Sequence, residues 1–435
     1  HNNLGLAQEY GGYTEEAEAS YKKAVELDPG NANYYNDLGV LFNNLKRYEE
    51  AIKWYKKALE LKPDSALFHE NIGLAYEKLG KKEEAKDAYQ TASENDPGSS
   101  KNLAKVYLDQ GNYEKAIELL EQAIQAEPDK AINYDQLGLA YEKSGQLEAA
   151  EKAYKTALEK ASTQKDIYLN NLGLYYYNKA DFQQAINYYQ QAIDIDPNHA
   201  VYFDNIGLAY EKLQQFSEAE KAYQQALVLQ PDKALYLNRM GTLFYRNGDF
   251  EKALTYYQQT VEKQPNDPIG WENLGLANEK LKHFDEAKLA YQKAINNAPE
   301  TDRDIYYNRM GILYYNQYKD KEAIEYYNRA VAIRPKAVYY ENIGLAYEGL
   351  KQLEEAKAAY EKAFELAPDN AEYQSRLVKI KAQLGELTDD AIIKPQDAAG
   401  YEQLGLALVA QQKNEEAEKA FINAIELVGD QEKEI

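Results

Sequence analysis

The segment from Phe203 to Gln230 decides the fold; it reads FDNIGLAYEKLQQFSEAEKAYQQALVLQ and is followed by Pro231. In its first half, Phe203, Ile206 and Tyr210 are spaced as on one face of an α-helix. The second half repeats this spacing until Pro231, whose ring and missing N–H prevent another helical turn. One such hairpin cannot bury its apolar face alone, so stacked copies of it predict a solenoid.

Copies of this segment fill nearly the whole chain. The glycine at position 207, which we call the marker glycine, leaves room for the close approach of a neighbouring backbone. Most successive markers are 34 residues apart, and Ala104 and Val378 take the place of two of them. The other markers are Gly5, Gly39, Gly73, Gly138, Gly173, Gly241, Gly275, Gly311, Gly344 and Gly405. An alanine follows twelve positions after each marker glycine and after Ala104, as Ala219 does in the quoted segment.

The pattern resembles the tetratricopeptide repeat, in which an aromatic residue, Leu-Gly, Tyr, Ala, Tyr or Phe, Ala and Pro stand at fixed offsets. The resemblance covers almost all 435 residues and about 12–13 repeats, and the chain is identified as a member of this family, of a bacterial kind. It implies an all-α, right-handed superhelical solenoid of antiparallel helix hairpins. It also implies a protein-interaction scaffold without enzymatic activity.

The repeat spacing divides the chain into four parts. Residues 1–384 form a superhelix of about eleven repeats and a lone helix, with an irregular entry to the fourth repeat at 97–104. Residues 385–397 form a linker or degenerate half-repeat, residues 398–428 a final hairpin, and residues 429–435 a polar tail. Because solenoid ends need a polar cap, we expect the terminal repeats, with Phe421, to contact another chain or domain.

Composition limits the partners and the compartment. The net charge of −22 repels phosphate backbones, so no nucleic-acid partner is expected. No apolar run is long enough for a membrane span, so direct insertion is not expected. The chain has no cysteine, which fits the cytoplasm or a bacterial periplasm equally, and the localisation stays open. The chain begins inside a first helix, so we expect that it starts partway through a longer protein.

An asparagine recurs two positions before the marker, and in this family the first helices line the concave surface. In the central repeats these residues are Asn171, Asn205, Asn273 and Asn342. They resemble the asparagine ladder of O-linked N-acetylglucosamine transferases, whose side-chain amides hold the backbone of an extended peptide. The alternative is that they bond neighbouring repeats to each other and set the superhelix twist. The sequence leaves both open.

Other residue types share this face. Carboxylates such as Glu211 and Glu279 form a rim that favours basic partner segments or is simply solvated, and Leu208 and Leu276 form an apolar floor that is partly buried. Alternate repeats carry a tyrosine in place of the glutamate, and basic residues occur at few positions. These residues are Tyr177, Tyr245, Tyr315, Arg239, Arg246 and Arg309.

The function favoured by these features is the binding of an extended peptide or protein segment in the concave groove. The alternative is a glycan-binding scaffold for polysaccharide export or assembly, because Tyr, Asn and Glu together suit sugar rings and hydroxyls. The four histidines, His1, His69, His199 and His283, lie far apart, and no catalytic, metal or cofactor motif occurs, so no enzyme and no cofactor are expected. The carboxylate clamp of chaperone-binding relatives is incomplete after Lys101, Asn102 and Lys105, and that role is rejected.

Overall fold

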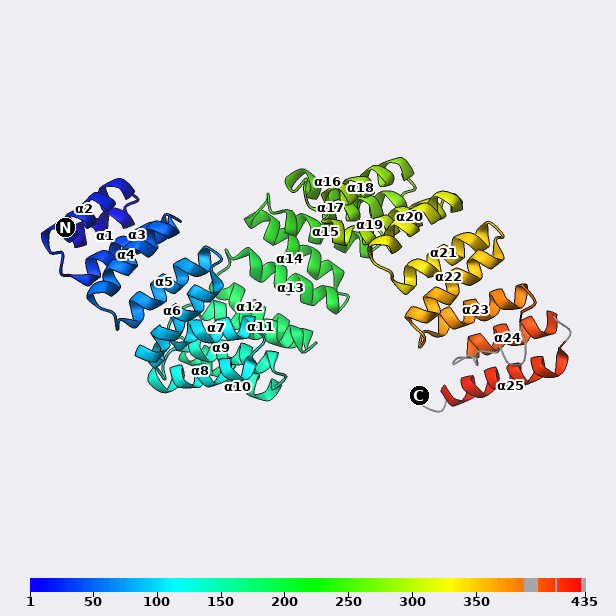
Figure 1. Cartoon of the computed structure of the whole chain (residues 1–435), viewed down its shortest axis with the longest axis horizontal. Coiled ribbons are helices and arrows are strands. Elements are labelled where there is room, and N and C mark those ends of the chain that lie inside the picture. The colour runs from blue at the N-terminus through cyan, green and yellow to red at the C-terminus, as the bar shows by residue number, and fades with distance from the viewer. Residues whose placement is uncertain (387–397, 411–412, 432–435) are drawn as a thin grey trace. The chain divides into compact units, whose positions relative to one another are not determined.

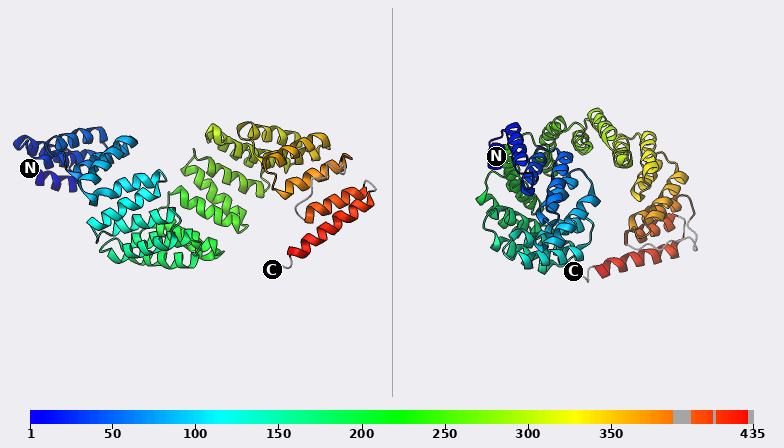
Figure 2. Two further views of the ribbon diagram at one scale, coloured as in Figure 1. Left: turned by 60° about the horizontal axis from the view of Figure 1, so that its bottom comes forward. Right: turned by 60° about the vertical axis from the view of Figure 1, so that its left-hand side comes forward.

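The structure is a computed structural model that describes residues 1–386, 398–410 and 413–431. This part of the chain contains 25 α-helices and two short 3-10 helices, and it has no β-strand. It divides into two compact units, His1–Ala222 and Tyr223–Ile435, which we call unit 1 and unit 2. Within each unit the helices follow one another in chain order as antiparallel hairpins (Figures 1 and 2).

The helices that begin in unit 1 are the following: α1 (Asn2–Tyr10), α2 (Thr14–Leu27), α3 (Ala32–Asn44), α4 (Tyr48–Leu61), α5 (Ala66–Lys78), α6 (Lys82–Asn95), η1 (Pro97–Ser99), α7 (Ser100–Asp109), α8 (Tyr113–Ala126), α9 (Ala131–Lys143), α10 (Leu147–Lys160), α11 (Lys165–Asn178), α12 (Phe182–Ile195), α13 (Ala200–Lys212) and α14 (Phe216–Leu229).

The helices of unit 2 are the following: α15 (Ala234–Arg246), α16 (Phe250–Lys263), α17 (Pro268–Lys280), α18 (Phe284–Asn297), η2 (Glu300–Asp302), α19 (Arg303–Tyr315), α20 (Asp320–Ile333), α21 (Ala337–Gly349), α22 (Leu353–Leu366), α23 (Ala371–Gln383), α24 (Ala398–Ala410) and α25 (Asn414–Gln431).

The marker glycine packs against an aromatic ring, not against a backbone as the sequence suggested. The ring belongs to the residue sixteen positions later, on the second helix of the same repeat. A Cβ atom added at Gly173 would lie 2.6 Å from the Tyr189 ring, and one at Gly275 would lie 2.4 Å from the Tyr291 ring. Because a Cβ atom cannot approach a ring this closely, only glycine allows the two helices their observed distance.

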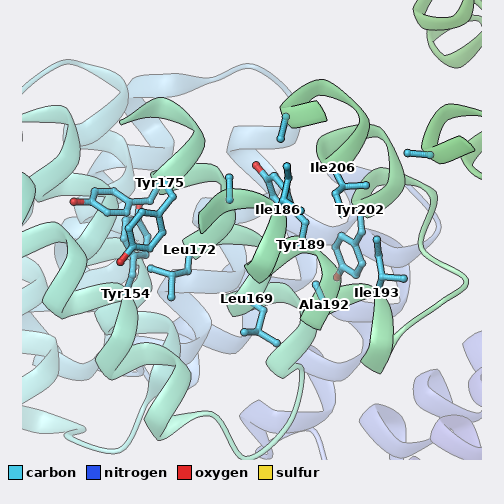
Figure 3. Packing of buried hydrophobic residues seen from close by; sticks show 14 of the residues in the cluster. Tyr154, Leu169, Leu172, Tyr175, Ile186, Tyr189, Ala192, Ile193, Tyr202 and Ile206 are labelled. Carbon is cyan, nitrogen blue, oxygen red and sulfur yellow. The ribbon is translucent and has the colours of Figure 1, made fainter. Parts of the chain in front are cut away.

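The core runs through consecutive repeats as a series of contacts between buried side chains. In the cluster of Figure 3, Tyr154 of one repeat lies beside Tyr175 of the next, with ring centroids 5.6 Å apart. Leu172, Tyr189 and Ile206 continue the cluster toward α13. Buried tyrosines therefore join each hairpin to its neighbours, which is how a solenoid is stable without a single central core.

Two predicted boundaries can be compared with the helices. At the irregular entry, η1 precedes α7, which has 10 residues where α9 has 13. At the C-terminus, α25 extends to Gln431, three residues into the segment that we assigned to the polar tail. Residues 387–397 of the expected linker lie outside the described residues, as do residues 432–435. The division into domains stays a prediction.

Candidate functional site

One stripe of most first helices combines aliphatic and polar side chains. It contains the residues six and two positions before the marker and one position after it, which follow one another at helical spacings of four and three. On α17 these residues are Ile269, Asn273 and Leu276. Ile269 is 54% exposed, whereas Asn273 and Leu276 are half-buried. An apolar residue lies on each side of a polar one in the same way on α5, α9, α11, α13, α19 and α21.

The residues six positions before the marker form what we call the aliphatic row. In unit 2 the row runs over four successive first helices, α15, α17, α19 and α21. Its members and their exposed fractions are Leu235 42%, Ile269 54%, Ile305 39% and Val338 41%. In unit 1 the row contains Ile132, Ile167 and Val201 on α9, α11 and α13, and Leu67 on α5. Gly98 takes its place before α7.

The asparagines two positions before the marker, which we call the ladder asparagines, bond neighbouring repeats to each other. Each donates from Nδ2 to the residue three positions before the marker of the preceding repeat. The donor–acceptor distances are Asn171 to Asp135 3.0 Å, Asn205 to Asn170 2.7 Å, Asn273 to Asn238 2.8 Å and Asn342 to Asn308 2.8 Å. The same rule holds earlier in the chain, where Asn71 donates to Asn36. The amides therefore have the structural role that the sequence left as an alternative, and their role in binding stays a prediction.

The arginine at the ladder position of α19 also bonds the preceding repeat, as the ladder asparagines do. Arg309 replaces the ladder asparagine on α19, and its Nε donates to Glu272 Oε1 at 2.8 Å. This bond raises the pKa of Arg309, although burial alone would lower it. Arg239 is half-buried and Arg246 exposed on α15. A guanidinium engaged with Glu272 is only partly available to set the register of a ligand.

The glutamates of the expected rim are anchored from two sides. Glu279 accepts a hydrogen bond from Tyr291 Oη at 2.8 Å, within its own repeat, and another from Asn316 Nδ2 of the next repeat at 2.8 Å. Glu142 is held in the same way by Tyr154 and Asn178. Glu211 is half-buried at the equivalent position. These carboxylates connect helices and repeats, so much of their hydrogen-bonding capacity is used within the fold.

Cations neutralise most of the acidic groups on the first helices of unit 2. Glu272 pairs with Arg309 at 2.8 Å, Glu341 with Arg376 at 2.7 Å, and Glu348 with Lys379 at 2.8 Å. Oppositely charged groups at this distance largely cancel each other's field beyond the pair. Beside the aliphatic row, the described surface of unit 2 is therefore much less acidic than the overall charge suggests.

Asp135 on α9 differs from these acids because its described partner is an amide. Asn171 Nδ2 lies 3.1 and 3.0 Å from its two carboxylate oxygens. Burial raises the pKa of Asp135 to about 6, and the bond from Asn171 only partly offsets this. The carboxylate at this repeat junction is thus held in an environment that disfavours its charge.

The tyrosines that we predicted to line the groove replace the glutamate in alternate repeats. Tyr177 contacts Phe182 edge to face with ring centroids 5.4 Å apart, and Tyr245 contacts Phe250 in the same way at 5.3 Å. Tyr315 is half-buried at the equivalent position of α19. The Tyr177 and Tyr245 rings thus pack on the first residue of the second helix of their own repeats.

Sequence reasoning missed part of this face. The site predicted from the sequence includes Leu208 and Leu276, one position after the marker, but none of the residues of the aliphatic row, such as Leu67, Ile167 and Leu235. The offset of six positions from the marker would have identified them. Leu208 and Leu276 are half-buried, so they are not the most exposed part of the apolar surface.

Stacked helical hairpins with one repeating face define a helical repeat scaffold. Models of the tetratricopeptide repeat match nearly all of residues 1–370, and the chain belongs to the tetratricopeptide repeat family, whose typical role is protein–protein interaction. The matched segments are 1–31, 20–53, 41–80, 66–99, 99–163, 129–198, 166–229, 205–268, 238–302, 305–337 and 337–370.

The solved structures that are similar to this chain include the following two. A tetratricopeptide repeat protein from Parabacteroides merdae ATCC 43184 is 21% identical with a TM-score of 0.44, over 57% of this chain and 98% of that one. The structure of MamA is 32% identical with a TM-score of 0.32, over 36% of this chain and 94% of that one. A search of curated proteins found no match.

Two further observations concern the described residues alone. None of the helices there has the length and apolar character needed to cross a lipid bilayer. His, Asp and Glu side chains in this part of the chain form no group of three that could hold a metal ion.

Proposed function

We propose that this chain is a non-enzymatic scaffold whose first-helix face binds an extended peptide or protein segment. The observation that carries the proposal is the aliphatic row of unit 2, which is exposed on four successive first helices. Isolated apolar residues are normal on a protein surface, whereas a periodic row on one face is typical of an interaction site.

The polar residues between the aliphatic side chains support an extended ligand. Asn273 and Asn342 each use one N–H group to bond the preceding repeat. A primary amide has a second N–H group and a carbonyl oxygen with two lone pairs. These remaining groups can pair with the backbone of a segment that has no internal hydrogen bonds. The same asparagines would then stabilise the solenoid and contact the ligand.

The charge pattern favours apolar over basic ligand side chains in unit 2. Glu272 and Glu341, which stand closest in sequence to the ladder position, both have arginine partners. A basic ligand would compete with those arginines, whereas an aliphatic side chain would gain buried area on Ile269 and Ile305 without breaking an ion pair. We therefore expect the bound segment of the partner to be apolar.

Peptide selection tests the proposal. Twelve-residue peptides are selected from a random display library on the whole protein, and their affinities are measured for the wild type and for the double variant Ile269→Ser with Ile305→Ser. We expect a loss of at least tenfold, because burying each aliphatic side chain contributes about 1–2 kcal/mol and about 1.4 kcal/mol is a factor of ten.

The matched control is Leu289→Ser on the second helix α18, where Leu289 is 68% exposed. It removes a similar apolar area from a different face, and we expect it to leave the affinity unchanged. Equal affinity of wild type and double variant for every selected peptide would refute the proposal. An array of oligosaccharides is probed in parallel, and binding there without any selected peptide would favour the glycan alternative.

A further inference from the structure

The spacing of the aliphatic row restricts the conformation of a bound segment, provided that the proposed function holds. The row has one member on each of α15, α17, α19 and α21, at the same position relative to the marker. Within it, α15 contacts α17 and α19 contacts α21. Packed helices lie about 8–10 Å apart, so the two row members within each of these contacting pairs recur at about that interval.

Regular peptide conformations differ in how far apart they place side chains on one side. A β-strand repeats every second residue, at about 6.6–6.8 Å, which is shorter than the interval of the row. An α-helix repeats at about 10.5 Å through every seventh residue, but its backbone is already hydrogen-bonded internally. A polyproline II helix has three residues per turn and rises about 3.1 Å per residue, so every third side chain recurs at about 9 Å on one side.

The ladder asparagines also favour a ligand in the polyproline II conformation. The backbone of a polyproline II helix has no internal hydrogen bonds, so its carbonyl and N–H groups need partners when water is displaced. Asn273 and Asn342 lie one helical turn from Ile269 and Val338, and their remaining amide groups can provide such partners. A conformation that is already extended also loses less entropy on binding.

We infer that unit 2 binds a polyproline II segment with an uncharged aliphatic side chain at every third position. Four residues place two such side chains about 9 Å apart, which matches the interval of about 8–10 Å within each of the contacting pairs α15–α17 and α19–α21. The absence of charge follows from the ion pairs Glu272–Arg309 and Glu341–Arg376, which cancel the local field of the acids beside the row.

Peptides of equal composition test the inference. Each has ten residues, with four leucines in a background of Pro, Ser and Ala, and only the leucine spacing differs: every third position, every second position, or clustered at one end. Titration of the whole protein should show at least tenfold tighter binding for the every-third peptide. That advantage should disappear in the variant Ile269→Ser with Ile305→Ser and persist in Leu289→Ser.

The possible failures are distinguishable. Tightest binding of the every-second peptide, or equal binding of all three, overturns the polyproline II inference. If none of the three binds while library-selected peptides bind and depend on Ile269 and Ile305, the inference is wrong and the proposed function stands. If no selected peptide depends on those two residues, the proposed function fails and the inference fails with it.

Discussion

Two neighbouring repeats of unit 1, α9–α10 and α11–α12, use the same scaffold with different side chains. In both, the marker glycine packs on a tyrosine ring: Gly138 on Tyr154, and Gly173 on Tyr189. In the first repeat the Tyr154 hydroxyl donates to Glu142, which also accepts from Asn178 of the next repeat. In the second repeat Tyr177 replaces the glutamate and packs on Phe182.

The comparison separates what the fold requires from what varies with the surface. The glycine–tyrosine contact is common to both repeats and sets the distance between the two helices. The residue four positions after the marker is either a hydrogen-bonded carboxylate or a packed ring, so it can change with little effect on the hairpin. The glycine–tyrosine contact therefore stabilises the hairpin. The residue four positions after the marker changes the surface on which a ligand would bind.

The largest expected effect comes from filling the glycine contact. Gly173→Ala places a Cβ atom 2.6 Å from the Tyr189 ring, and Gly138→Ala places one 2.8 Å from Tyr154. We expect both to lower the free energy of unfolding by about 2–3 kcal/mol, because the ring or the helix must shift. Urea denaturation followed by circular dichroism measures this loss.

Gly270→Ala on α17 is the control for the glycine substitutions. The nearest atoms to its added Cβ, from Thr260 and Val261, lie at 3.4 Å. It should cost little or even stabilise the helix, because alanine favours a helix more than glycine does. A loss at Gly270 as large as that at Gly173 would show that backbone conformation, and not contact with the ring, explains the glycines.

A smaller effect of opposite sign is expected at the polar junction between the same repeats. Asp135→Asn should raise the free energy of unfolding at pH 7–8 by roughly 1–2 kcal/mol, because it removes a partly buried charge and keeps an acceptor for Asn171. The resulting pair is the one that Asn170 and Asn205 form at the next junction. Glu272→Gln is the control, and it should lower stability because Arg309 loses its anionic partner.

The pH dependence of the Asp135→Asn variant sharpens this prediction. The pKa of Asp135 is raised from 3.8 to about 6 in the folded protein, so between these values the folded state holds a proton that the unfolded state has lost. The contribution of Asp135 to stability therefore falls as pH rises from about 4 to about 6. The advantage of the variant in melting temperature should grow over that interval and level off above it, and an advantage that is independent of pH would contradict this.

The smallest effect distinguishes the two tyrosines. Tyr154→Phe removes the bond to Glu142 and should cost about 1 kcal/mol, whereas the Tyr189 hydroxyl has no hydrogen bond within the described residues. Tyr189→Phe should therefore change stability by only a few tenths of a kcal/mol. Equal costs from thermal melting of the two variants would mean that the Glu142 bond is not what distinguishes the repeats.

The fold could be predicted from the sequence because its period is explicit. The spacing of marker glycines and prolines indicates the number and order of the hairpins, and α13 and α14 are the two helices that the pattern predicts in the segment from Phe203 to Gln230. The sequence also predicted a close contact at each marker. It could not identify the Tyr189 ring as the group in contact with Gly173, because this depends on how the second helix packs on the first.

The candidate site was less predictable. Helical spacing places Asn171 and Asn205 on the first-helix face, but it does not tell whether an amide faces a ligand or the next repeat. That answer requires the register of adjacent helices, which brings Asn171 to Asp135 and Arg309 to Glu272. For the same reason the net charge was a poor guide to unit 2, since the sequence does not show which acids have cation partners.

The central claim is that the aliphatic row contacts the ligand, and site-specific cross-linking tests it most directly. A benzophenone amino acid replaces Ile269 in one protein and Leu289 in another, and each is irradiated with the tightest library-selected peptide. The account predicts that the peptide is cross-linked from position 269 and not from position 289. Cross-linking from position 289 with none from position 269 would contradict it.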